Sequence, residues 1–185
     1  IEIKAITHRN NPIWHASYVG RPPHEDDLMR SLSQEAEIAA QCRQHPIRKI
    51  HSAEGGCGGF IVIASIKKEF EGQGKTVALS ILGTTPPGRW IKILIIVDED
   101  IDPSDMTQVQ WAMSTRFQPE RDVDIIKHIT GPGLDPSRLD QESVIQSKLI
   151  IDATKPVRTP YPEMVYPKRD VMERVVKEWK KYGLS

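Results

Sequence analysis

Residues 91–122, with the sequence IKILIIVDEDIDPSDMTQVQWAMSTRFQPERD, indicate the fold class of this chain. The segment Ile91–Val97 is the most hydrophobic strand candidate, which is typical of a central strand covered on both faces. Three acidic residues at positions 98–100 follow it in a short turn, and a helix is then predicted over Pro103–Arg116. A buried strand that leads through a turn into a helix favours a layered α/β domain.

The rest of the chain continues this alternation of strands and helices. Short alternating or apolar runs bounded by turn-forming residues predict strands, and apolar residues at helical spacing predict helices. We therefore expect an α/β fold with a layered mixed sheet flanked by helices. The predicted strands are Ile1–Thr7, Ile47–His51, Phe60–Ile66 and Val123–Ile129, the other helices are Asp26–Cys42, Gly74–Leu82 and Lys168–Tyr182, and Thr130–Ser147 is predicted to be a long exposed loop.

The helix predicted over Asp26–Cys42 is amphipathic. Acidic residues stand near its start, and apolar residues recur along it with helical spacing. Gly55–Gly59, with the sequence GGCGG, is expected either to be flexible or to lie against another backbone. The apolar positions of the helix are Leu28, Leu32, Ala36, Ala39 and Ala40.

Composition sets limits on the class of protein. At 185 residues the chain is long enough for one domain with a sizeable core, and 25 basic residues balance 25 acidic ones. This balance gives no reason to expect nucleic acid or an anionic membrane as a partner. Two cysteines, Cys42 and Cys57, are too few for a disulfide framework and fit a reducing cytoplasm.

The chain shows no segment that would take it to or through a membrane. Its longest apolar run, Ile93–Val97, is far shorter than a membrane span, and no signal peptide is visible. The sequence opens on IEIKAI without an initiator methionine, so we expect it to be a fragment of a longer protein. We predict a cytoplasmic location.

The acidic turn after Ile91–Val97 has two interpretations. Hard divalent cations prefer oxygen ligands, so Asp98, Asp100 and Asp102 could form a cation site. Alternatively, these acids solvate the end of the strand, and Asp102 or Ser104 caps the next helix. No histidine or further carboxylate stands at a spacing that would complete a metal site, which favours the structural interpretation.

Lys75 is the strongest candidate for an anion site. It lies in Gly72-Gln73-Gly74-Lys75-Thr76, at the start of the helix predicted over Gly74–Leu82. A phosphate there would meet backbone N–H groups, the helix dipole and an ammonium together. The glycine-rich nucleotide motifs GxxxxGK[ST] and GxGxxG are absent from the chain, and a plain surface lysine is the alternative.

Four separated motifs, in order, resemble the C-terminal domain of the UbiD family. They are AITHRNNPI, SIKKEFEGQGK, KILIIVDEDIDPSDMTQVQWAMSTRFQPERD and SKLIIDATKP, and together they span nearly the whole chain. The resemblance implies a reversible, non-oxidative decarboxylase of aromatic or hydroxybenzoic acids. It implies prenylated FMN as the cofactor, with a divalent metal and with or without potassium, bound mainly by an upstream flavin-binding domain.

The resemblance also assigns roles to single residues. It implies that Lys75 contacts the cofactor phosphate, and that Ile13, Ile81 and Met113 line an apolar pocket for the aromatic substrate. The family's catalytic arginine and glutamate residues and its metal-binding carboxylate have no counterpart here, so no catalytic residue and no metal ligand is predicted. Arg116 is expected to be satisfied by carboxylates, with Glu120–Asp122 also structural. The isolated chain is expected to be inactive.

The family further implies a homo-oligomer, either a dimer or a hexamer. We divide the chain into an α/β domain over residues 1–155 and a tail with a terminal helix over residues 156–185. One face of that helix is apolar and has no partner within so short a tail, so we expect it to pack on a neighbouring subunit. The alternative is a stand-alone, non-catalytic assembly or regulatory domain. The apolar residues of the terminal helix are Val171, Met172, Val175, Val176 and Trp179.

Overall fold

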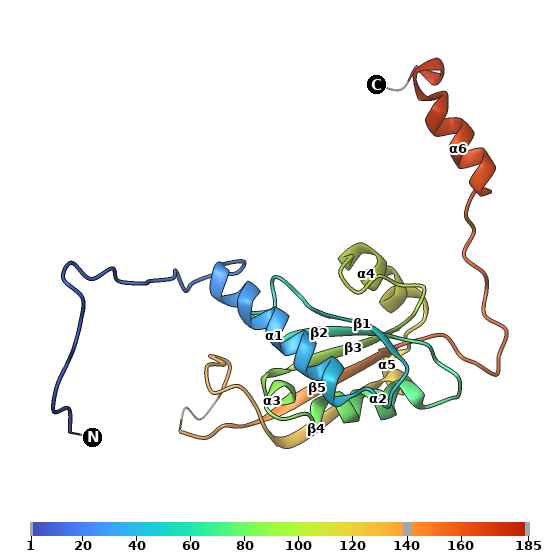
Figure 1. Cartoon of the computed structure of the whole chain (residues 1–185). Coiled ribbons are helices and arrows are strands. Elements are labelled where there is room, and N and C mark those ends of the chain that lie inside the picture. The colour runs from blue at the N-terminus through green and yellow to red at the C-terminus, as the bar shows by residue number, and fades with distance from the viewer. Residues whose placement is uncertain (1, 139–141, 184–185) are drawn as a thin grey trace.

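One mixed sheet forms the centre of the protein. The computed structural model describes residues 2–138 and 142–183, and its five strands lie in the order β1-β2-β3-β5-β4 (Figure 1). The central strands β2, β3 and β5 are parallel, and the edge strands β1 and β4 are antiparallel to their neighbours. This confirms the predicted layered α/β fold. The strands are β1 (Ile47–Ser52), β2 (Ile61–Ile66), β3 (Ile93–Asp98), β4 (Val123–Thr130) and β5 (Ile145–Ala153).

Helices cover both faces of the sheet. α1 and α2 share one core cluster with the sheet, which Ile91 joins as the C-cap of α3, and α4 packs in a second cluster on the opposite face (Figure 1). Strand β3 shows why: Leu94 and Ile96 belong to the first cluster, whereas Ile95 and Val97 belong to the second. The helices are α1 (Glu25–Gln41), α2 (Gln73–Leu82), α3 (Pro87–Trp90), α4 (Met106–Thr115), α5 (Pro119–Asp122), α6 (Arg169–Lys177) and the 3-10 helix η1 (Trp179–Tyr182).

Two of the predictions about strands are wrong. Residues 2–7 are exposed and form no strand, because no described strand lies beside them to complete a ladder. Ile1 lies outside the described residues. The loop predicted over Thr130–Ser147 ends earlier than expected, because β5 begins at Ile145 and becomes an interior strand between β3 and β4.

A buried lysine near the start of β5 explains why the strand was not predicted from the sequence. Lys148 is 2% exposed, and its Nζ donates hydrogen bonds to the backbone carbonyl oxygens of Gly88, Arg89 and Ile91. Burial lowers the pKa of Lys148 to about 8. The ammonium therefore fixes the end of α3 to β5 through carbonyl groups rather than through an acid.

The orientation of α1 is unusual for an amphipathic helix. Its buried side chains are those of Asp27, Gln34 and Ile38. The residues that define its apolar face point away from the core, although such a face normally packs inward. The exposed apolar positions are Leu28, Leu32, Ala36, Ala39 and Ala40.

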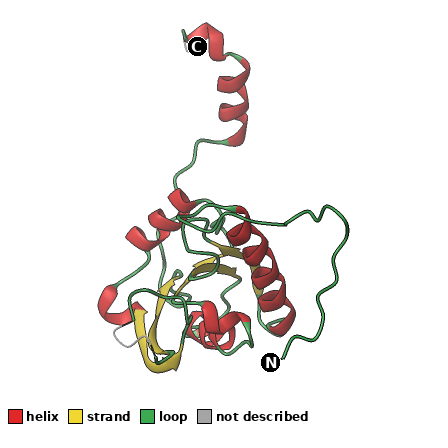
Figure 2. Cartoon of the chain, turned by 90° about the vertical axis from the view of Figure 1, so that its left-hand side faces the viewer, coloured by secondary structure: helices red, strands yellow, loops and turns green. Residues whose placement is uncertain are grey.

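The two ends of the described chain leave the body of the protein in different directions (Figure 2). An extended N-terminal arm over residues 2–23 leads into α1, and an extended tail leads from β5 to α6. None of the described side chains of α6 is buried. β5 ends at Ala153, and the predicted domain boundary after residue 155 stays a prediction. Among the described residues, no helix is long and apolar enough to cross a membrane.

Candidate functional site

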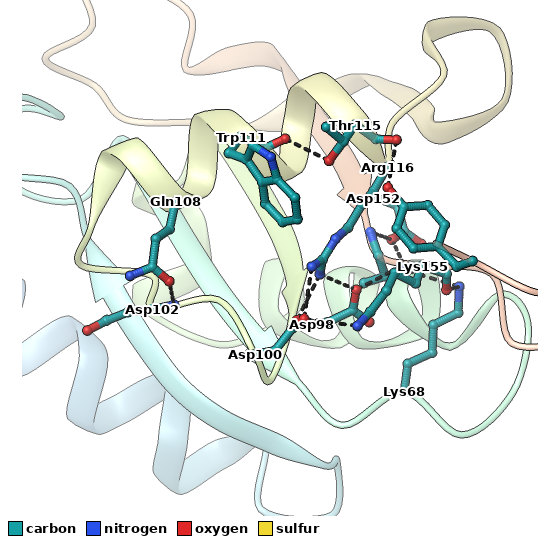
Figure 3. A network of polar contacts seen from close by, with 12 residues as sticks. Lys68, Asp98, Asp100, Asp102, Gln108, Trp111, Thr115, Arg116, Asp152 and Lys155 are labelled. Carbon is teal, nitrogen blue, oxygen red and sulfur yellow. Dashed lines mark hydrogen bonds and ion pairs between the residues drawn. The ribbon is translucent and has the colours of Figure 1, made fainter. Parts of the chain in front are cut away.

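A buried arginine organises the acidic turn at the end of β3. Arg116 is the C-cap of α4, and its Nη1 donates to Asp98 Oδ2 at 2.7 Å. The same guanidinium holds both carboxylate oxygens of Asp100, at 2.8 and 2.9 Å (Figure 3). Lys155, just beyond β5, joins the network through its backbone N–H to Asp98 and its ammonium to Asp100. The prediction that carboxylates satisfy Arg116 is confirmed.

The environment of this network shifts the pKa values of its two carboxylates in opposite directions. Burial raises the pKa of Asp98, and the hydrogen bond from the Lys155 N–H and the charge of Arg116 offset it only in part. Burial would also raise the pKa of Asp100, but the hydrogen bonds from Arg116 and Lys155 lower it to about 2. Because the side chain of Arg116 is only 1% exposed, its charge is held inside the protein by these acids.

The neighbours of Arg116 complete a fixed arrangement. Its guanidinium carbon lies 5.1 Å from the ring centroid of Trp111, a cation–π contact one turn back along α4. The Tyr161 hydroxyl donates to the Thr115 carbonyl at 2.9 Å and so ties the tail to the end of the same helix. Met113 lies on α4 and packs, partly buried, against the core cluster on that face of the sheet.

The third acid of the turn has a separate structural role. Asp102 accepts from Lys49 at 2.6 Å and from the Ser104 N–H and hydroxyl. Neither Asp102 nor Ser104 caps α4; Asp105 is the N-cap and accepts from the N–H of Thr107. The prediction of the cap was wrong because Pro103 and Ser104 form a turn before the helix begins.

The acids of the turn do not gather into a metal site. Within residues 2–138 and 142–183, one group of three potential ligands lies close enough together, and it comprises His24, Asp26 and Asp27 at the start of α1. Arg30 already pairs with Asp27 at 2.8 Å and approaches Asp26 at 3.6 Å. The described acids therefore support the structural interpretation of the acidic turn.

Lys75 lies beside a polar cavity of about 410 Å³ near the carboxyl ends of the parallel strands. It stands in the first turn of α2, and its ammonium contacts Asp124 Oδ1 of β4 at 2.6 Å. Its side chain is 54% exposed, so a ligand can reach it. Gly74 is needed for the close approach of α2 to β5, because a Cβ there would collide with the Asp152 carboxylate.

The same cavity contains cations that sequence analysis did not single out. Lys68 donates to the Thr154 hydroxyl at 3.0 Å and contacts Glu71 at 3.2 Å, and Arg121 pairs with its neighbour in sequence. The sequence holds little signal for this grouping, because the residues come from separate segments that meet only in the folded chain. The charged lining residues are Lys68, Lys75, Arg121, Glu71, Asp122, Asp124 and Asp152.

The structure does not bring the three predicted substrate-lining residues together. Ile13 is 81% exposed on the N-terminal arm. Met113 belongs to α4 and is partly buried against the second core cluster. Ile81 is fully buried, because it lies on the face of α2 that packs against the sheet with Val77 and Ala78. The prediction that Ile81 lines a pocket is contradicted by this burial.

A larger and more apolar groove lies between α4 and the tail. It has a volume of about 720 Å³, and neither Met113 nor Lys75 contributes to it. Its walls come from the outer side of α4 and from residues 161–166 of the tail. The lining residues with large side chains are Ile101, Trp111, Tyr161, Met164 and Tyr166.

Comparison with known proteins identifies the family. The family model for the 3-octaprenyl-4-hydroxybenzoate carboxy-lyase C-terminal domain, UbiD_C, matches residues 27–153. A phenolic acid decarboxylase from Sedimentibacter hydroxybenzoicus is 37% identical over 157 residues, which are 85% of this chain and 32% of that protein. The chain thus spans about a third of the length of the curated relatives it matches.

Solved structures of the same class share the fold. The closed form of vanillic acid decarboxylase from S. hydroxybenzoicus matches with a TM-score of 0.80 and 32% identity, over 95% of this chain and 37% of that one. The UbiD-class enzyme HmfF from Pelotomaculum thermopropionicum, in complex with FMN, matches with a TM-score of 0.70 and 30% identity. That match covers 79% of this chain and 33% of the HmfF chain.

Proposed function

This chain belongs to the UbiD family, and from that premise we propose that it is the C-terminal domain of a longer decarboxylase. The proposed enzyme reversibly removes CO₂ from an aromatic or hydroxybenzoic acid with prenylated FMN. The decarboxylase names of the similar proteins and the FMN complex of HmfF support this proposal. Since the chain corresponds to about a third of such relatives, the catalytic arginine and glutamate and the metal ligands are proposed to lie in the remainder.

The observation that carries the cofactor proposal is the exposed ammonium of Lys75 in the first turn of α2. The helix terminus and the nearby cations Lys68 and Arg121 suit the phosphate end of a flavin. When bound, prenylated FMN supplies the electron sink for loss of CO₂. Lys75 would hold the phosphate in place of the Asp124 carboxylate, which it contacts in this structure.

Met113 and Ile13 are the proposed contributions to the substrate pocket. Met113 is placed by α4, whose end is fixed by the buried pairs of Arg116 with the acidic turn. Ile13 lies on an exposed arm that has room to pack against another domain. Apolar side chains at such a pocket would orient a planar ring and exclude water from it. Ile81 is not part of this proposal.

The proposed motion is closure of this domain over the flavin-binding domain. The related vanillic acid decarboxylase has been solved in an open and a closed form, which supports such a motion here. We propose a homo-oligomer in which α6 contacts a neighbouring subunit. The upstream domain is proposed to hold a divalent metal, with or without potassium. The proposed location of the enzyme is the cytoplasm.

The decisive experiment uses the full-length polypeptide that contains this chain. We would co-express it with a prenyl-FMN synthase and measure CO₂ release from hydroxybenzoates together with flavin absorbance. Turnover with bound flavin is the expected result. A polypeptide without a flavin-binding portion, or one with no flavin absorbance and no turnover on any acid tested, would instead support the stand-alone assembly or regulatory domain.

A further inference from the structure

His24 and Asp27 form a buried polar cluster where the N-terminal arm meets α1. Their side chains are 5% and 6% exposed, and His24 Nε2 lies 3.1 Å from Asp27 Oδ2. Despite this approach, Asp27 Oδ2 has no hydrogen-bond partner among the described residues, and neither has His24 Nδ1. Buried polar atoms are normally paired, so unpaired atoms on two adjacent buried side chains indicate a place where a ligand can bind.

Asp26 completes a set of three potential metal ligands. One nitrogen of His24 and one carboxylate oxygen each of Asp26 and Asp27 lie within 4.8 Å of one another. Ligand atoms held at about 2.0–2.1 Å by a tetrahedral Zn²⁺ stand about 3.3 Å apart. The approach of His24 Nε2 to Asp27 Oδ2 is close to that value. The Asp26 side chain is 42% exposed, so it is free to move the remaining distance.

Arg30 holds the two carboxylates without using the oxygen that faces His24. Its Nη2 donates to Asp27 Oδ1 at 2.8 Å, which leaves Asp27 Oδ2 available. The same nitrogen lies 3.6 Å from Asp26 Oδ2, beyond the length of an ordinary hydrogen bond. Carboxylates that bind metal ions are themselves usually hydrogen-bonded, and these outer contacts fix their orientation. Arg30 therefore suits the role of an outer partner of the site.

The charges around the cluster favour a dication. Glu25, Asp26 and Asp27 all stand in the first turn of α1, and Arg30 is the cation that pairs with two of them. Two negative charges therefore remain uncompensated within this group. The positive end of the helix dipole offsets only about half a charge. A neutral imidazole and two carboxylates can then share one divalent ion.

Two other segments enclose the cluster. Gly58 has a φ of +59°, and a Cβ there would lie 2.6 Å from Asp27 Oδ1, so the glycine loop packs directly on the carboxylate. On the arm, the ring of Tyr18 contacts that of His24 edge to face, with the centroids 6.2 Å apart. The Tyr18 N–H also donates to Glu25 at 3.3 Å. An ion bound here would connect the arm to the start of α1.

We propose that His24, Asp26 and Asp27 bind a divalent transition-metal ion such as Zn²⁺, with water in the remaining position. One nitrogen and two carboxylate oxygens suit such an ion better than Mg²⁺ or Ca²⁺, which prefer oxygen ligands alone. None of the three residues lines the cavity of Lys75. The site is separate from the metal proposed for the upstream domain, and failure of one proposal leaves the other standing.

The test measures Zn²⁺ binding to the 185-residue chain by isothermal titration calorimetry. The metal of the enzyme is proposed to lie in the remainder of the full-length polypeptide, so the stoichiometry reports this site alone. We expect one Zn²⁺ per chain and much weaker binding of Mg²⁺. His24→Gln, Asp26→Asn and Asp27→Asn should each weaken binding by more than the roughly 100-fold that loss of an outer-shell partner can cost.

Two matched variants separate this site from adventitious binding. His15→Gln removes an exposed histidine of the same arm, and Cys57→Ser removes an exposed thiol; both should leave Zn²⁺ binding unchanged. Zn²⁺ should also slow hydrogen exchange of the arm beside Tyr18 in the unmodified chain. If circular dichroism shows that the ligand variants lose their helices, that exchange measurement decides. No Zn²⁺ binding by the unmodified chain, binding that Cys57→Ser or His15→Gln abolishes, or no change in exchange beside Tyr18 would overturn the proposal.

Discussion

The network around Arg116 and the cavity around Lys75 lie near the carboxyl ends of the same parallel strands, yet their charges serve different purposes. Arg116 is almost wholly buried, and its Nη1 and Nη2 atoms donate to Asp98 and Asp100. Its Nε has no hydrogen-bond partner among the described residues. Lys75 is 54% exposed and forms an ion pair with Asp124 at the edge of a cavity. The buried ion pairs of Arg116 hold α4 and the acidic turn in place. The exposed ammonium of Lys75, by contrast, can exchange the Asp124 carboxylate for a ligand.

The largest effect is expected when the closed network is opened. Replacing Arg116 by Ala removes the charge that pairs with the buried Asp98, and should lower the free energy of unfolding by about 3–5 kcal/mol. Urea unfolding of the chain measures this. Arg121→Ala is the matched control on the same segment: its side chain is 65% exposed, so the change should stay below about 0.5 kcal/mol. Equal stability of Arg116→Ala and the unmodified chain would contradict the structural role of the network.

A smaller effect is expected at Lys148, a buried cation whose Nζ donates to three backbone carbonyls. Lys148→Met leaves three backbone carbonyls without their donor and should cost about 2 kcal/mol in unfolding free energy at pH 7. The folded-state pKa of about 8 lies below the ordinary 10.5, so the unfolded chain binds more protons between these values. Stability of the unmodified chain should therefore rise from pH 8 toward pH 10.5, and Lys148→Met should lack that contribution. A Met variant as stable as the unmodified chain would refute the role of Lys148.

The smallest effect on folding is expected at Lys75. Because its pair with Asp124 is exposed, Lys75→Ala should change the free energy of unfolding by less than about 0.5 kcal/mol. In the full-length polypeptide, the same change should weaken retention of the flavin cofactor, measured by absorbance after gel filtration. Lys67→Ala, at an exposed lysine that is not among the residues lining the cavity, serves as the control. Full retention in Lys75→Ala would remove Lys75 from the proposed cofactor site.

Much of the fold could be predicted from local patterns, and the failures have physical causes. The helices over residues 25–41 and 73–82 and the strands β1 to β4 follow the periodicity of their apolar residues. β5 was missed because Lys148 interrupts its apolar run with a charge that only the folded chain satisfies. The strand predicted over Ile1–Thr7 does not form in the described residues 2–7. The alternation of apolar and polar residues indicates which side of a strand would be buried, but it does not show that another strand is present to pair with its backbone.

The candidate site was predictable only in part. Lys75 and Arg116 stand out in sequence because of the glycines around the first and the acids before the second. Lys68 and Lys155 do not, since each gains its meaning from segments more than 50 residues away. Ile81 was misassigned because the side of α2 that faces the sheet depends on how the helix docks.

The amino-acid sequence by itself determined the family, the alternation of strands and helices, and the acidic character of the turn after β3. These follow from short-range patterns and from motifs that remain readable without a fold. The tertiary structure alone decided that Asp98 and Asp100 enclose Arg116, that Lys75 meets Asp124, and that the apolar face of α1 points outward. Such outcomes depend on which distant segments become neighbours, and on whether burial leaves a charge paired or accessible.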